Sequence, residues 1–128
     1  MENFSKIFRF REFQVYRDAR IFNVELKKFS GNQFPDSERF GLLTQLWRAL
    51  DSILLNIAEG SDRGTDRDFA HFLNLSHTSL NEVVACLDVA LDNGYLTATD
   101  HSKYLEKAAR LADQLTAFRK RLRLNPTK

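Results

Sequence analysis

Four stretches of this chain repeat apolar residues every three or four positions, the spacing that places side chains on one face of an α-helix. Three short polar breaks separate these stretches, and no segment alternates polar and apolar residues over a useful length. Because short connections make consecutive helices antiparallel, the sequence predicts an all-α protein, an antiparallel up-down-up-down four-helix bundle. We expect one domain over residues 1–128, with helices at about 12–30, 37–59, 66–93 and 99–123.

The three breaks carry residue types that end or begin helices. Ser30-Gly31-Asn32 is expected to end the first helix, and Asn93-Gly94 is expected to end the third. Thr65 stands three residues before an acidic residue, which is the spacing of an N-cap and its partner at the start of the third helix. Either Thr97 or Thr99 can cap the fourth helix.

Length, cysteine content and hydropathy limit the class of protein. A chain of 128 residues fits one domain that can bury a sizeable core. A single cysteine, Cys86, excludes an intramolecular disulfide and fits a reducing compartment. No apolar run reaches the length of a signal peptide or of a membrane span. We therefore expect a cytoplasmic protein that has no membrane partner.

The polar residues do not form a recognisable catalytic or metal-binding motif. His71 and His77 are six residues apart, which turns them about 240° from each other on a helix, so they cannot chelate one metal ion as a His-x-x-x-His pair does. His101 belongs to another predicted helix. No nucleophile elbow and no glycine-rich phosphate loop occurs. We expect a non-enzymatic protein with no catalytic residues, no metal and no cofactor.

Charge is distributed unevenly along the chain. Residues 1–33 contain seven basic and four acidic residues, residues 34–98 contain four and ten, and residues 99–128 contain eight and three. The first and fourth helices of such a bundle are normally adjacent, so their cations should form one basic face that can contact phosphates. The expected nucleic-acid-binding residues are Lys6, Arg9, Arg11, Lys27, Lys28, Arg119, Lys120, Arg121 and Arg123.

Two other interpretations of these cations remain open. The run 119–123 can be a solvated helix end, where cations favour the negative end of the helix dipole. Basic and acidic faces on adjacent subunits can also pair with each other and leave nothing for nucleic acid.

The second helix is more apolar than one core-facing side requires. Trp47, Leu54 and Leu55 extend its apolar surface beyond the stripe that faces the bundle core. Exposed together they would form a patch better covered by another subunit, so they are the expected subunit-interface residues. The alternative is that Trp47 packs over a loop of its own chain.

The same helix ends in a compact polar cluster. Asn56, Glu59 and Gly60 are expected to form a helix terminus, with Gly60 in the left-handed C′ conformation and the two polar side chains bonded to loop amides or to a neighbouring helix. The alternative is a polar ligand site that also includes residues of the second and third helices. Those additional residues are Arg48, Ser52 and Glu82.

Short motifs in a fixed order extend over most of the chain. They are Phe10-Arg11-Glu12-Phe13-Gln14-Val15-Tyr16, Phe34-Pro35, Glu38-Arg39-Phe40-Gly41-Leu42, Gln45, Arg48-Ala49, Ser52-Ile53, Asn56-Ile57-Ala58-Glu59-Gly60, Phe69, Phe72-Leu73, Ser79-Leu80, Glu82 and Gly94-Tyr95-Leu96. In this order and spacing the chain resembles the four-helix-bundle proteins encoded within intervening sequences of bacterial 23S rRNA genes. The resemblance implies a ring-shaped homopentamer. A bundle related to that family, the accessory protein of diversity-generating retroelements, binds nucleic acid through a basic surface.

The chain departs from the family pattern at three positions. Leu54 stands where members often have proline, which should leave the second helix straight. Trp47 replaces a second basic residue beside Arg48, and Thr78 replaces a glycine. The change at Trp47 weakens the case for nucleic-acid contact on that face.

Taken together, these features predict a non-enzymatic, self-assembling helical bundle. Its basic face is expected to bind nucleic acid with low sequence specificity or to act as a scaffold. Its expected partners are further copies of itself, in a homopentamer, and RNA or DNA. The alternative is a protein–protein interaction module that binds no nucleic acid.

Overall fold

The computed structural model describes residues 4–124, apart from the side chain of Ser5, and contains four long helices and three short helical turns within that range. The predicted domain of residues 1–128 also includes 1–3 and 125–128, which lie outside the described residues. The elements in chain order are α1 (Phe4–Ile7), the 3₁₀ turn η1 (Arg9–Glu12), α2 (Gln14–Gln33), the 3₁₀ turn η2 (Asp36–Glu38), α3 (Leu42–Ser61), α4 (Asp66–Asp92) and α5 (Ala98–Leu124).

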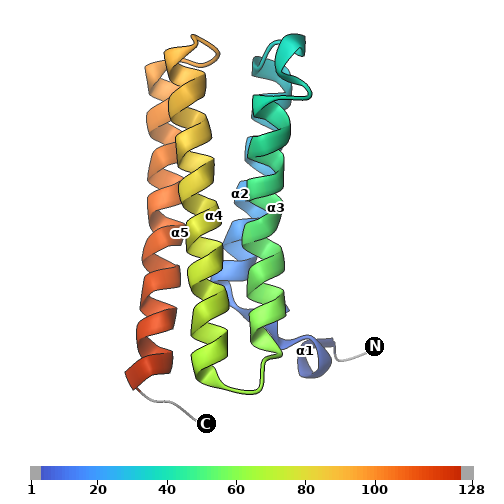
Figure 1. Cartoon of the computed structure of the whole chain (residues 1–128), viewed down its shortest axis with the longest axis vertical. Helices are drawn as coiled ribbons and strands as arrows, with labels where there is room; N and C mark the ends of the chain where they lie inside the picture. Colours follow the sequence, from blue (N-terminus) through green and yellow to red (C-terminus); the bar gives the residue numbers. More distant parts are fainter. Residues whose placement is uncertain (1–3, 125–128) are drawn as a thin grey trace.

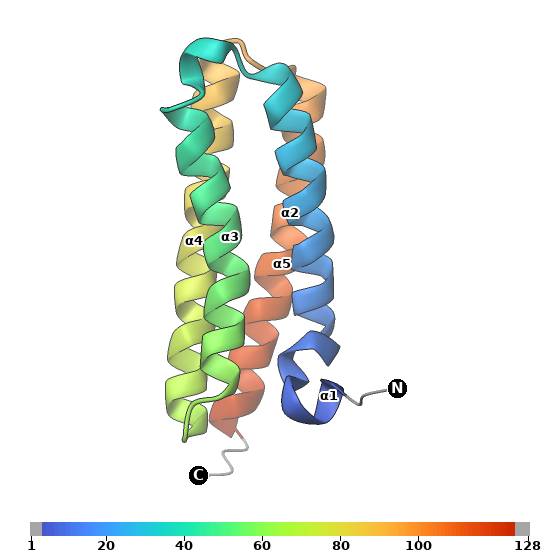
Figure 2. The same cartoon turned by 90° about the vertical axis from the view of Figure 1, so that its right-hand side faces the viewer.

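The long helices form the predicted up-down-up-down bundle. Helix α2 packs on α3 and on α5, and α4 packs on α3 and on α5, so each long helix has two neighbours (Figures 1 and 2). We call the end that holds α1, η1, the start of α2, the 62–65 connection and the last turns of α5 the basal end. The opposite end, which holds the 34–41 and 93–97 connections, is the apical end.

The first helix is longer than predicted, because Ser30-Gly31-Asn32 does not end it. Helix α2 continues to Gln33. The Ser30 hydroxyl donates to the Leu26 carbonyl at 2.7 Å, which keeps its hydrogen bond inside the helix. The indole of Trp47 covers Gly31, since a Cβ atom added there would be 3.5 Å from Trp47 Cζ2. Packing against α3 therefore holds this last turn helical.

The second long helix begins later than predicted. Residues 36–38 form the separate turn η2, and α3 starts at Leu42. The Glu38 carboxylate accepts hydrogen bonds from the Leu42 amide at 3.0 Å and from the Tyr95 hydroxyl at 2.7 Å. These two bonds lower the pKa of Glu38 below its ordinary value, the Leu42 bond having the larger effect. Glu38 thus stabilises the first turn of α3 and links it to Tyr95 in the other apical connection.

The predicted helix caps of the second half are confirmed, and one alternative is decided. Thr65 Oγ1 accepts from the backbone amide three residues later, at the start of α4. Helix α4 ends at Asp92, and Gly94 has φ of 78°, a conformation that favours glycine. At the start of α5 the cap is Thr97, whose Oγ1 accepts from the Asp100 amide at 3.1 Å, and not Thr99.

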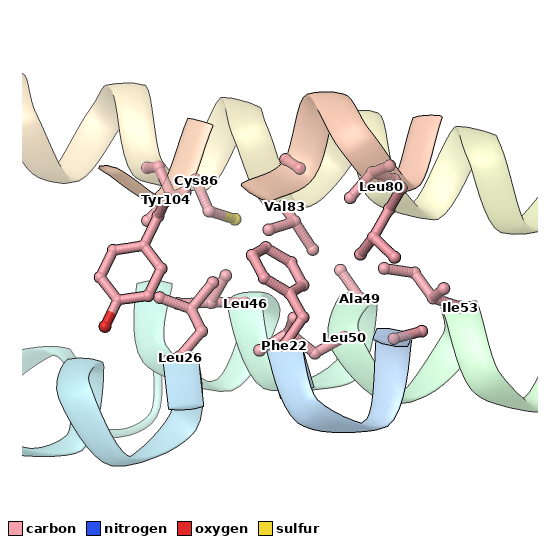
Figure 3. Close-up of a cluster of buried hydrophobic side chains, with 14 of the residues drawn as sticks. Phe22, Leu26, Leu46, Ala49, Leu50, Ile53, Leu80, Val83, Cys86 and Tyr104 are labelled. Atoms are coloured by element: carbon pink, nitrogen blue, oxygen red, sulfur yellow. The ribbon is translucent and has the colours of Figure 1, made fainter. Parts of the chain in front are cut away.

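The core consists of the apolar stripes that the sequence predicted, and they interleave along the bundle axis (Figure 3). Leu46 and Val83 are fully buried between facing helices. Ser76 is also fully buried, and its hydroxyl donates to the Ile53 carbonyl at 2.9 Å, which ties α4 to α3. Within the described part of the chain, every buried side-chain nitrogen and oxygen has a hydrogen-bond partner.

None of the helices within residues 4–124 combines the length and the apolar character needed to cross a bilayer.

Candidate nucleic-acid interface

The topology brings the basic run 119–123 to the same end of the bundle as Arg9 and Arg11. Helix α2 begins at the basal end, and α5, which runs antiparallel beside it, finishes there (Figures 1 and 2). Lys27 and Lys28 lie near the other end of α2, far along the axis from Arg119–Arg123. The expected single basic face on these two adjacent helices therefore stays a prediction. The nucleic-acid-binding residues expected from the sequence divide into a basal group and the apical pair Lys27 and Lys28.

A groove between the start of α4 and the end of α5 holds much of the basal charge. We call it the α4–α5 groove; its volume is about 430 Å³. Arg67 and His71 reach it from α4, and Arg119 and Arg123 reach it from α5. The full lining is Asp66, Arg67, Ala70, His71, Asn74, Arg119, Leu122 and Arg123.

The other cations of the 119–123 run point elsewhere. Arg121 lines a separate groove between α2 and α5, where its guanidinium carbon is 5.1 Å from the centre of the Phe118 ring. Lys120 is exposed on α5. Because a helix turns about 100° per residue, the run presents cations on two sides of α5 at once.

Arg9 is committed to holding the basal end together. Its Nη2 donates to the Ser61 carbonyl at 2.8 Å, at the last residue of α3. Its guanidinium carbon also lies 5.5 Å from the Phe13 ring centre and 5.4 Å from that of Phe69. Arg11 is exposed, with its guanidinium carbon 5.9 Å from the Phe4 ring centre. Of these two residues, Arg11 is the one whose position suits contact with a ligand.

Lys27 serves the contact between α2 and α3. Its ammonium group is 2.6 Å from the Asp51 carboxylate, which also accepts from the Asn23 amide at 3.0 Å, and it lies 5.7 Å from the Trp47 ring centre. Partial burial alone would raise the pKa of Asp51, but the hydrogen bonds from Lys27 and Asn23 and the charge of Lys27 outweigh it, so the pKa is lowered. Lys28 is exposed at the same level of α2.

The polar end of α3 differs from the expected glycine-terminated helix. Gly60 lies inside α3, is buried and does not have the left-handed conformation, so that prediction is wrong. Its role is close packing: a Cβ atom there would be 2.5 Å from Phe72 Cβ. Glu59 is exposed and pairs with Arg63 at 3.3 Å, one turn along. The helix terminus itself is formed by Ser61, whose hydroxyl donates to the Ala58 carbonyl.

Part of the alternative polar site does come together on the outer side of α3 and α4. Asn56 Nδ2 donates to the carbonyl and hydroxyl oxygens of Ser52, and the hydroxyls of Ser52 and Ser79 are 2.8 Å apart. The Ser52–Ser79 contact joins α3 to α4, and the polar groups of these three residues form hydrogen bonds with one another. The remaining members of the predicted cluster, Arg48 and Glu82, are exposed, and so is the family-motif residue Gln45.

The three expected subunit-interface residues of α3 occupy different environments. Trp47 Nε1 donates to Ser30 Oγ at 3.1 Å, so the indole packs on α2 of its own chain. Leu54 packs against the core, whereas Leu55 is 68% exposed. Leu55 lines a surface pocket together with Ile7 and other residues of α1 and η1. Leu55 is thus the most exposed of the three, and Trp47 is 36% exposed.

The residues on the α4 side of the α4–α5 groove are not among those predicted from the sequence to bind nucleic acid. Arg67, His71 and Asn74 are spaced by four and three residues, which places them on one face of α4. That spacing was visible in the sequence. The residues that face it from α5 depend on the register of two antiparallel helices, which the sequence pattern does not give. Within residues 4–124 no three His, Cys, Asp or Glu side chains are grouped to hold a metal ion.

A family model for the 23S rRNA-intervening sequence protein matches residues 11–117, which is most of the chain. The chain belongs to this family. The match includes the α3 motifs and all of α4, and it ends within α5 at residue 117, before the basic run 119–123.

The fold is also similar to that of a solved structure. A protein of unknown function from the S23 ribosomal protein family of Bacteroides thetaiotaomicron VPI-5482, in a crystal structure at 1.70 Å resolution, matches with a TM-score of 0.75. The sequences are 21% identical, and the match covers 83% of this chain and 95% of that one. At this identity the likeness concerns the fold alone. No curated protein matches the chain.

Proposed function

We propose that this protein binds the sugar–phosphate backbone of RNA through the basal end of the bundle, without catalysis and without reading the base sequence. The observation that carries the proposal is the set of arginines at that end. None of the ion pairs within residues 4–124 involves Arg11, Arg67, Arg119, Arg121 or Arg123. Arg11, Arg67, Arg121 and Arg123 are exposed and Arg119 is partly buried. Guanidinium groups that make no ion pair suit phosphate oxygens. Contacts of this kind position a protein on a strand but carry no base information.

RNA rather than DNA is the proposed ligand because the family is named after the intervening sequence of 23S rRNA. The proposed compartment is the cytoplasm, where the buried thiol of Cys86 would stay reduced.

The test is fluorescence polarisation with a labelled 20-nucleotide RNA of mixed sequence, repeated over a salt series. The variant Arg119→Glu/Arg121→Glu/Arg123→Glu should weaken binding by at least about tenfold and make the salt dependence shallower, because fewer counterions are released. The matched control is Lys28→Glu/Arg39→Glu/Lys103→Glu, which changes the same amount of charge at exposed apical positions. Equal affinity of the basal variant and the parent protein would refute the proposal.

We also propose that the protein self-associates, and the family resemblance makes a homopentamer the expected assembly. Support comes from an apolar patch at the basal end, where Leu55 is 68% exposed and Ile7 is 67% exposed in one surface pocket. Several basal ends in one particle would raise the avidity for a long RNA.

Light scattering on a size-exclusion column tests assembly. Leu55→Glu should reduce the particle mass, whereas Asn81→Glu, at an exposed polar position of α4, should not. A monomeric parent protein at micromolar concentration would refute self-association. Trp47→Glu is less informative, because Trp47 also supports the contact between α2 and α3.

The apolar patch supports a second candidate function, a protein–protein interaction module that binds no nucleic acid. The salt series separates the two functions. If RNA binding is absent at all salt concentrations while Leu55→Glu still disrupts an assembly, the interaction module is the correct function.

A further inference from the structure

We infer that the α4–α5 groove is a binding site for a terminal phosphate group, so that the protein prefers RNA ends that carry a phosphate monoester. The inference rests on the proposed function and goes further, because it assigns one groove and one chemical group. The residues that carry it are three arginines, Arg67, Arg119 and Arg123, together with His71 and Asn74.

The first argument is the kind of cation. The lining of the groove contains three arginines and no lysine, whereas the apical cations include Lys27, Lys28 and Lys103. A guanidinium group presents a planar fork of donors that can bind two oxygens of one phosphate, and an ammonium group acts as a point charge. Three guanidinium groups can share a phosphate whose oxygens are accessible from several directions, and a terminal phosphate offers three such oxygens.

The second argument is the charge balance. The three arginines and Asp66 give the lining a formal net charge of +2, with histidine left out of the count. A phosphate monoester carries a charge of about −1.5 to −2 near pH 7, and a phosphodiester carries one negative charge. The groove therefore matches a terminal phosphate better than an internal one.

The third argument is the position of these residues on rigid helices. Arg119 and Arg123 are one turn apart on α5, and Arg67 and His71 are one turn apart on α4. The two rows face each other across a cavity of about 430 Å³ with Ala70 and Leu122 between them. Polar groups held on helices lose less freedom on binding than groups on loops. The amide of Asn74 and the imidazole of His71 can add hydrogen bonds to phosphate or ribose oxygens.

The arrangement also explains why the groove would favour an end of a strand. An internal phosphate continues into a nucleotide on both sides, so both neighbours would have to fit around the walls formed by α4 and α5. A terminal phosphate enters with chain on one side only. The groove lies at the basal end, and Arg121, on another side of α5, lines a separate groove between α2 and α5.

Three RNA oligonucleotides of one 12-nucleotide sequence test the inference, with a 5′-phosphate, with a 3′-phosphate, and with hydroxyl groups at both ends. The parent protein should bind at least one phosphorylated form at least about fivefold more tightly than the hydroxyl form. Arg67→Gln/Arg119→Gln should abolish this preference while residual salt-dependent binding remains. The matched control Arg11→Gln/Arg121→Gln removes the same charge outside the groove and should keep the preference, with lower affinity for all three RNAs.

The outcomes separate this inference from the proposed function. Equal affinity of the parent protein for the three RNAs, with binding that falls as salt rises, would overturn the phosphate site and leave the backbone-binding function standing. A preference that survives in Arg67→Gln/Arg119→Gln would also overturn the assignment to this groove, provided that circular dichroism shows the same helicity as in the parent. Absence of RNA binding at all salt concentrations would refute both.

Discussion

Gly60 of α3 lies against Phe72 of α4 so closely that a Cβ atom at Gly60 would be 2.5 Å from the Phe72 Cβ and 3.0 Å from Phe69 Cδ1. Real Cβ atoms do not approach a side-chain carbon to 2.5 Å, so any other residue forces the two helices apart. Because the obstructing atom is a Cβ, fixed directly to the α4 backbone, side-chain rotation cannot relieve the clash. The glycine thus sets the distance between α3 and α4 where they approach their shared connection.

Gly60→Ala should therefore destabilise the protein, although alanine is intrinsically the better helix former. We expect a loss of about 1–3 kcal/mol in the free energy of unfolding, the usual cost of overpacking a well-packed site. Urea denaturation followed by circular dichroism measures this loss. Gly64→Ala is the control, since no atom lies within 4 Å of an added Cβ there and the φ angle is not positive. A Gly60→Ala protein as stable as the control would show that α3 and α4 can separate freely.

The hydrogen bond from Trp47 to Ser30 gives a second prediction. Ser30 is fully buried, and its hydroxyl accepts from the indole at 3.1 Å while donating to the Leu26 carbonyl. Ser30→Ala removes the acceptor for the indole, so we expect a loss of about 1 kcal/mol in unfolding free energy. Trp47→Phe should cost at least as much, and the double variant should cost less than the sum. Additive losses in this double-mutant cycle would mean that the two residues act independently.

The apolar stripes and Gly60 illustrate what the sequence could and could not predict. The apolar stripes predicted the four helices and most of the core, because burial on one helix face leaves a periodic signal in the residues themselves. A glycine near a polar break has the same local signature whether it ends a helix or allows a close contact. The distance to Phe72 decides between the two, and it is a property of two helices.

The site shows the same division between local and tertiary information. The residues 119–123 were recognised from their charge, and the adjacency of the first and last long helices followed from the predicted topology. Their distribution between two grooves depends on how α5 is rotated against α2 and α4. The same tertiary placement committed Arg9 to Ser61 and Lys27 to Asp51, contacts between residues 52 and 24 positions apart in the chain.

The start of α5 allows a test of helix capping with two neighbouring threonines. Thr97 Oγ1 accepts a hydrogen bond from the Asp100 amide, and Thr99, one position inside α5, is exposed. Thr97→Ala should cost about 1 kcal/mol of unfolding free energy, because an amide of the first turn loses its partner. Thr99→Ala should be close to neutral, since alanine is favoured inside a helix. Thermal denaturation of both variants distinguishes them, and equal melting temperatures would contradict the assignment of the cap.

The Asp51 carboxylate predicts a pH dependence of stability. Its pKa in the folded protein is below the ordinary value of 3.8, so the unfolded chain takes up a proton at a higher pH than the folded protein does. The stabilisation is therefore complete above the unfolded-state pKa and is lost as the pH falls through the folded-state pKa. Because the Asp51 side chain is 51% exposed, solvent screening limits the effect to well under about 1 kcal/mol.

Asp51→Asn should remove this contribution. Unfolding free energies of the parent and variant, measured by urea denaturation from about pH 6 to pH 3, should converge as the pH decreases. Asp36→Asn provides a control, because Asp36 is exposed and forms no ion pair within residues 4–124. A constant difference between Asp51→Asn and the parent across the range would exclude a titrating contact with Lys27.

The length of the bundle means that the whole-chain net charge of +2 says little about how an anion experiences this molecule. Helix α5 has 27 residues, so the bundle is about 40 Å long, whereas the Debye length at physiological ionic strength is about 8 Å. Asp88 and Asp92, near the apical end, are thus several screening lengths from a phosphate that meets Arg119. A strand that approaches the basal end therefore experiences mainly the cations of that end, whereas the apical end presents Asp88 and Asp92 together with Lys27, Lys28 and Lys103.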